Sequence, residues 1–78
     1  MLDDPNLKTI DQWEATIKDK QFTLWISESN EETKIYVIHA GWEGNRFSLV
    51  LNKNKPTRED VEYRFLHDDG FLKHFGLQ

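Results

Sequence analysis

The fold is decided by two segments, KIYVIHA (residues 34–40) and RFSLVL (residues 46–51), which are separated by five residues. β-Branched and aromatic side chains fill both segments, and such residues favour a pleated, half-buried strand. Gly41, Gly44 and Asn45 lie between the segments and are typical turn residues. The stretch therefore predicts a β-hairpin with a bulged or four- to five-residue connection.

An alternating segment precedes the hairpin at residues 21–27. Phe22, Leu24 and Ile26 occupy every second position, so they are expected to share the core-facing side of a strand. Trp25 then points to the opposite side. Because short connections usually join neighbouring strands, the three segments predict a three-stranded antiparallel meander.

The N-terminal segment carries helix signals. Thr9 and Gln12 have the spacing of a capping box. Ile10, Trp13 and Ile17 follow at helical spacing. These signals predict a helix over residues 9–19, with residues 1–6 as a frayed lead-in.

The C-terminal segment carries a second set of helix signals. Thr57 is a suitable N-cap, Val61 and Phe65 share one helical face, and Gly70 is suited to the position after the helix end. We therefore expect a helix that begins at Thr57 and ends near residue 68 or 69. A short apolar helix over residues 71–75 follows.

These elements predict an α+β fold in one domain, residues 1–78. The expected architecture is a two-layer α-β-β-β-α domain, in which helices cover one face of a three-stranded meander and a short C-terminal helix is added. The expected core consists of Ile10, Trp13, Ile17, Phe22, Leu24, Ile26, Ile38, Phe47, Leu49, Leu51, Val61, Phe65 and Leu72.

Composition narrows the class of protein. The chain has 78 residues, no cysteine and a formal net charge of −4, so it is a small acidic chain without disulfides. No apolar run approaches the roughly 18 residues of a membrane span, and the acidic start lacks the apolar core of a signal peptide. We expect a cytoplasmic protein that does not contact membranes.

Catalytic and metal-binding patterns are weak. His39, His67 and His74 lack the i+3 or i+4 spacing of a helical ligand pair. The adjacent acidic pairs fall in expected loops and helix starts, and the sequence has no glycine-rich phosphate loop and no cysteine nucleophile. The sequence therefore predicts a protein that is not an enzyme and needs no metal or cofactor.

Aromatic and apolar side chains on the uncovered side of the sheet indicate an interaction surface. If helices cover one face, Trp25 and Val50 remain on the other, together with Tyr36 or Val37, and Trp42 lies at the hairpin tip. Trp and Tyr are enriched where proteins bind one another. We interpret Trp25, Tyr36, Trp42 and Val50 as a candidate protein-binding surface, for another protein or for self-association, and expect a regulator or inhibitor of a larger assembly.

A basic segment supports a second interpretation. Residues 33–58 carry five Lys or Arg and one Glu, whereas both flanking segments are acidic. Such a cluster attracts anions, and a helix start adds free N–H groups. The alternative function is nucleic-acid binding through Lys34, Arg46, Lys53, Lys55 and Arg58.

Overall fold

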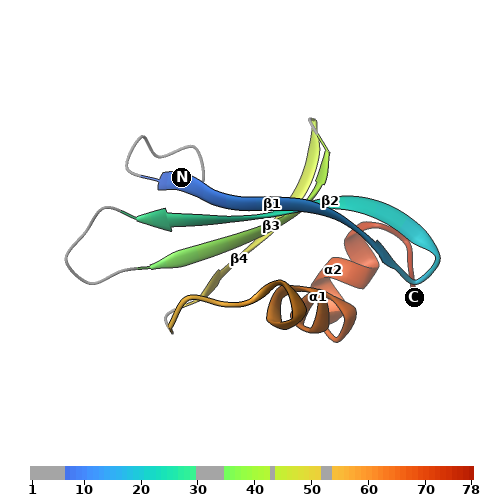
Figure 1. The fold of residues 1–78 in the computed structure, drawn as a ribbon. Coiled ribbons are helices and arrows are strands. Elements are labelled where there is room, and N and C mark those ends of the chain that lie inside the picture. Colours follow the sequence, from blue (N-terminus) through green and yellow to red (C-terminus); the bar gives the residue numbers. More distant parts are fainter. Residues whose placement is uncertain (1–6, 30–34, 43, 52–53) are drawn as a thin grey trace.

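The computed structural model describes residues 7–29, 35–42, 44–51 and 54–78. These residues form an antiparallel sheet of four strands in the order β1-β2-β3-β4, with two short helices on one side (Figure 1). The α+β class and the antiparallel sheet are thus confirmed. The elements are β1 (Leu7–Ile17), β2 (Lys20–Ser29), β3 (Tyr36–Trp42), β4 (Asn45–Leu51), α1 (Arg58–Leu66) and α2 (Asp69–His74).

The predicted helix over residues 9–19 is wrong, because residues 9–17 belong to strand β1 and residues 18–19 form the turn that follows it. The sheet therefore has four strands rather than three, and the element order begins with a strand. The register between β1 and β2 shifts between Thr9 and Asp11, which leaves Ile10 as an extra residue in a bulge. The bulge lets Ile10 and Trp13 both pack against the core, although they are three residues apart. Their helix-like spacing is thus the signature of an interrupted strand.

A tight turn joins β1 to β2. Lys18 and Asp19 both have positive φ angles, 52° and 65°. Two successive positive φ angles define the type I′ turn, whose twist matches that of a two-stranded hairpin. The sequence lacks the Asn-Gly or Asp-Gly pair that usually marks this turn, so the hairpin was not predicted from the residues.

The apolar core lies between the sheet and the helices. The predicted phase of β2 is confirmed, since Phe22, Leu24 and Ile26 are buried on the helix-covered side. Ile38 and Ala40 of β3 lie opposite Ile26 and Leu24 and extend the same layer. The predicted core residues Ile10, Trp13, Phe47, Leu49 and Leu51 are only partly buried. The buried apolar residues that the prediction omitted are Tyr36, Val37, Ala40, Phe71 and Phe75.

Both helices have capped starts, and aromatic rings hold them on the core. Thr57 forms a capping box with Asp60, as its position indicated. The Asp68 side chain accepts a hydrogen bond of 2.8 Å from the Phe71 N–H at the start of α2. Ring centroids of Phe65 and Phe71 are 4.9 Å apart. In the described part of the chain, neither helix has the length and apolar character of a membrane-spanning segment.

Gly70 does not end the preceding helix, because it is the second residue of α2. A Cβ at this position would lie 3.2 Å from the Phe47 ring and 3.1 Å from the Asp68 carboxylate. The absent side chain therefore lets α2 approach β4 closely.

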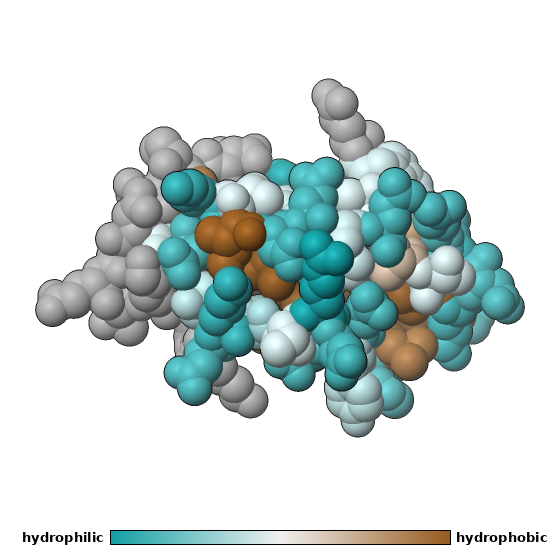
Figure 2. All heavy atoms as spheres, viewed as in Figure 1, coloured by the Kyte–Doolittle hydropathy of each residue, from teal (hydrophilic) through white to brown (hydrophobic). Residues whose placement is uncertain are grey.

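Seen as in Figure 1, the surface is mainly hydrophilic, and hydrophobic residues appear only in separate small patches (Figure 2).

Polar contacts attach α1 to the edge strand β1. Arg58 donates two hydrogen bonds to Asp11, at 2.9 Å from Nε and 2.8 Å from Nη2. The Trp13 indole N–H donates to the Glu62 carboxylate at 2.9 Å, and the Arg58 guanidinium lies 5.0 Å from the Trp13 ring centroid. The fork-shaped guanidinium matches the carboxylate geometry, so these contacts fix the position of α1 along β1.

The Asp11–Arg58 pair predicts a loss of stability in acid. The hydrogen bonds from Arg58 hold the pKa of Asp11 below its ordinary value of 3.8. A carboxyl whose pKa is lowered by folding stabilises the fold above its unfolded pKa, and this contribution is lost as the pH falls through the folded pKa. Asp11→Asn should therefore flatten the decline in melting temperature below about pH 4.

Arg58→Gln supplies the matched variant for this measurement, because it removes the cation and leaves Asp11 in place. Thermal melts of both variants, followed by circular dichroism from neutral pH down to acid, should show the same flattening. Parent-like acid sensitivity in both variants would exclude the pair as its source.

Candidate functional site

The side of the sheet opposite α1 and α2 is termed the helix-free face. Residues directly opposite one another on neighbouring strands point to the same side, so the strand register assigns its members. From β1 to β4 the face consists of the rows Glu14–Thr23–Gly41–Arg46, Gln12–Trp25–His39–Ser48 and Thr9–Ser27–Val37–Val50.

A buried histidine joins three strands on this face. His39 is 1% exposed, and its Nε2 lies 3.1 Å from the Ser27 hydroxyl on β2. Its Nδ1 lies 2.7 Å from the Ser48 hydroxyl on β4. A hydroxyl can donate or accept, so the two serines can satisfy the imidazole in either tautomer. The three side chains form a cross-strand hydrogen-bond bridge, not an accessible nucleophile and base.

The indole of Trp25 covers this bridge. Its ring stacks on the His39 ring with centroids 4.9 Å apart and an interplanar angle of 15°. The Arg46 guanidinium lies 6.0 Å from the Trp25 centroid, within the range of a cation–π contact. Trp25 remains half-buried, so part of its ring faces solvent. The result is an aromatic platform whose orientation is fixed by the residues beneath it.

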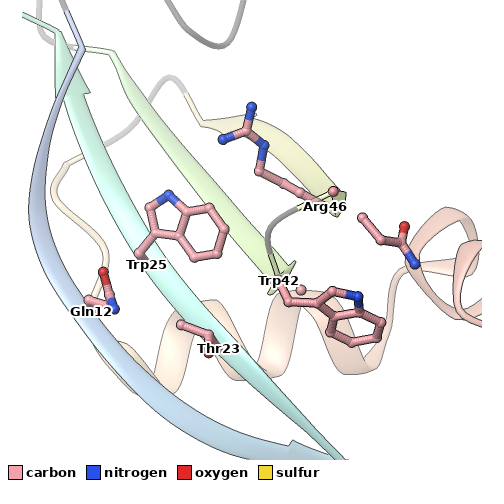
Figure 3. A pocket seen from close by; sticks show the side chains of 8 residues that line it. Gln12, Thr23, Trp25, Trp42 and Arg46 are labelled. Atoms are coloured by element: carbon pink, nitrogen blue, oxygen red, sulfur yellow. The ribbon is translucent and has the colours of Figure 1, made fainter.

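A hollow lies beside this platform and is termed the hairpin groove. Its volume is about 640 Å³. The side chains of Trp25, Thr23, Gln12 and Arg46 surround it (Figure 3). The full lining is Gln12, Thr23, Trp25, Gly41, Trp42, Gly44, Asn45 and Arg46.

Gly41 belongs to the lining of the groove. It stands between Thr23 and Arg46, so the one position without a side chain separates two side chains that flank the groove. Its φ angle is +132°, and a Cβ built there would lie 2.3 Å from the backbone oxygen of Asn45. Only glycine fits this backbone without a shift, so the path of the β3–β4 hairpin beside the groove requires glycine here.

The end of the groove is formed by Trp42, which is 43% exposed. Its ring centroid lies 6.0 Å from that of Phe22 and 5.5 Å from that of Phe75, on the helix-covered side. The Lys20 ammonium lies 5.7 Å from the same ring. Trp42 is therefore partly anchored by the core and presents its remaining surface at the hairpin end.

The predicted protein-binding residues separate into two groups. Trp25 and Val50 lie on the helix-free face, and Val50 is 55% exposed. Tyr36, however, is buried in the core cluster, because it shares the phase of Ile38. A hydrogen bond with the Glu28 carboxylate, together with burial, raises the pKa of the Tyr36 hydroxyl. Of the two residues expected on this face, Val37 rather than Tyr36 occupies it.

The predicted basic set is not gathered on one surface. Lys34 and Lys53 lie outside the described residues. Arg46 lies on the helix-free face at the hairpin end, whereas Arg58 begins α1 and is bound to Asp11 on the helix-covered side. Lys55 is exposed and interacts electrostatically with the same Asp11 carboxyl. The described members therefore point to two separate places.

Gln12 was not predicted as a groove residue, because it lies on β1, which the sequence had indicated as a helix. The alternation of Gln12, Glu14 and Thr16 with Trp13, Ala15 and Ile17 was the available signal. Within the described residues, no group of three or more His, Cys, Asp or Glu side chains could hold a metal ion. Comparisons with known protein families, curated proteins and solved structures found no match.

Proposed function

We propose that this chain is a small, non-enzymatic domain that binds another protein through the helix-free face, at the hairpin groove. The observation that carries this proposal is the fixed indole of Trp25, which stands half-exposed beside a hollow on the sheet face opposite the helices. An aromatic ring held in place before binding buries area at low entropic cost. The small size of the chain fits a role as a cytoplasmic regulator or inhibitor of a larger assembly.

The groove combines two kinds of recognition group. Trp25 and Trp42 offer aromatic surface, whereas Gln12, Thr23 and Arg46 offer hydrogen-bond donors and one positive charge. Protein-binding hot spots are enriched in Trp and Arg, and polar groups around them fix the orientation of the partner. This combination supports a polypeptide that places an apolar side chain on the indole and a polar or acidic group near Arg46.

Nucleic-acid binding is the less supported alternative. Trp25 and Arg46 could stack a base and attract a phosphate, as in proteins that bind single strands. However, the described cations of the predicted set are divided between the two sides of the sheet, and Arg58 is already bound to a carboxylate. A groove that tracks a phosphate backbone needs several aligned positive charges.

Trp25→Thr tests the proposal. Threonine keeps strand propensity, so the variant should retain its circular-dichroism spectrum and a cooperative melt. Loss of a central aromatic anchor is worth roughly 2 kcal/mol or more, so capture of the bound protein should fall by at least about tenfold. Tagged parent and variant proteins would be compared by affinity capture from native lysate and quantitative mass spectrometry.

Tyr63→Thr is the matched control, because Tyr63 is an exposed aromatic residue on α1, away from the groove. It should capture the same proteins as the parent. Equal capture by the parent and by Trp25→Thr would contradict the proposal. If nucleic acid co-purifies and is lost on Lys53→Glu with Lys55→Glu rather than on Trp25→Thr, the alternative function is favoured.

A further inference from the structure

The two edges of the sheet are protected differently. The edge strand β1 carries a bulge between Thr9 and Asp11 and the charged residues Lys8, Asp11 and Glu14. The other edge strand, β4, pairs with β3 without interruption from Tyr36↔Leu51 to Trp42↔Asn45. Bulges, charges and prolines are the usual devices that prevent an edge strand from pairing with another chain. β1 has two of them, whereas β4 has neither bulge nor proline and only one charged residue, Arg46.

The apolar side chains of β4 are incompletely covered. Val50 is 55% exposed on the helix-free face. On the opposite side, Phe47, Leu49 and Leu51 pack against the core but remain partly exposed, whereas Ile38 and Ala40 of the neighbouring β3 are fully buried. An additional strand beside β4 would cover these three side chains, in the same way that β4 covers the side chains of β3. A regular, apolar and partly exposed edge is a template for strand addition.

The sequence of β4 complements itself when read in the opposite direction. Antiparallel pairing of two β4 strands about Ser48 places Ser48 opposite the partner's Ser48. Phe47 then lies opposite the partner's Leu49, and Arg46 lies opposite the partner's Val50. Each apolar residue of the central five meets an apolar side chain or the alkyl stem of arginine. The one charged residue of the strand does not face its own copy, so no like charges oppose each other.

We infer that β4 is a self-association edge, at which a second copy of this chain adds its own β4 in antiparallel register and joins two four-stranded sheets into one. The arrangement is isologous, as expected of a two-fold dimer. Its two-fold axis stands perpendicular to the joined sheet, so both helix-free faces lie on the same side. The inference concerns the edge of the sheet and does not depend on the proposed role of the hairpin groove.

The first test measures the mass of the intact protein across concentration by sedimentation equilibrium. The parent should show a monomer–dimer equilibrium. Val50→Lys places an ammonium opposite the partner's Arg46 twice in each dimer, and like charges directly opposite in a sheet are destabilising. The dimer dissociation constant should rise at least about tenfold. Thr16→Lys is the matched control, because Thr16 is exposed on β1 at the other edge, and it should leave the constant unchanged.

A charge exchange tests the register. Arg46→Glu combined with Val50→Lys places opposite charges at both facing positions, so dimerisation should recover to within about threefold of the parent. Each variant is checked by circular dichroism and thermal melting, so that loss of folding is recognised. The inference is overturned if the parent remains monomeric at about 1 mM, the weak end of specific association. It is equally overturned if Thr16→Lys weakens the dimer as much as Val50→Lys, or if a different polypeptide, rather than a second copy, occupies this edge.

Discussion

Replacing Phe22 by alanine is expected to destabilise the domain by about 3–5 kcal/mol, the usual loss for a large aromatic residue removed from a core. Phe22 is buried, and its ring contacts those of Phe71 and Phe75 at centroid distances of 5.2 and 4.8 Å. The ring thus connects β2 to α2. A chain of 78 residues has a total stability of roughly 4–12 kcal/mol, so this one substitution should remove at least about a quarter of it.

Urea unfolding followed by circular dichroism measures this loss. Tyr63→Ala is the matched control, because it removes an aromatic ring of similar size that is 67% exposed on α1. It should shift the unfolding free energy by less than about 0.5 kcal/mol. A Phe22→Ala protein with the parent's midpoint would show that α2 does not depend on this aromatic contact.

Local alternation was sufficient to predict the central part of the sheet. In β2, the buried positions Phe22, Leu24 and Ile26 follow a period of two without interruption, and the structure confirms them. The α1 start was equally readable, since the Thr57 cap depends only on residues within one turn. Signals of this kind need no knowledge of how distant segments pack.

In the N-terminal strand the alternation holds only over residues 12–17, and helix signals compete with it. The bulge at Ile10 shifts the apolar phase by one residue, and the resulting spacing to Trp13 and Ile17 matches a helix as well as an interrupted strand. What favours the strand is pairing with β2 and the contact of Trp13 with Glu62, 49 residues away. Tertiary pairing overrides the local pattern at this position.

The candidate site was only partly predictable for the same reason. The phase of β2 alone places Trp25 on the side opposite Phe22, Leu24 and Ile26. The groove beside it depends on register, because Gln12, Thr23 and Arg46 come from three different strands. The bridge beneath Trp25 requires Ser27 and Ser48 to flank His39 on two different strands. No spacing within one segment carries that information.

His39→Ala is expected to destabilise the domain by on the order of 3 kcal/mol. The substitution removes a buried imidazole and leaves a cavity under Trp25. It also leaves the hydroxyls of Ser27 and Ser48 without the hydrogen bonds that they make to the ring, at 3.1 and 2.7 Å. Ser27 is buried and Ser48 is partly buried; a buried hydroxyl without a partner costs about 1–3 kcal/mol, in addition to the packing loss.

A comparison of apolar replacements separates the hydrogen bonds from the packing. His39→Leu alone fills most of the space but leaves both hydroxyls unpaired, so it should remain clearly destabilised. Adding Ser27→Ala and Ser48→Ala removes the unpaired groups, and replacing both members of a hydrogen bond by apolar groups is often nearly neutral. The triple variant should therefore recover much of the unfolding free energy, measured by urea titration. If the triple variant is less stable than His39→Leu alone, the two serines stabilise the sheet independently of His39, and the bridge is not the element that joins β2, β3 and β4 beneath Trp25.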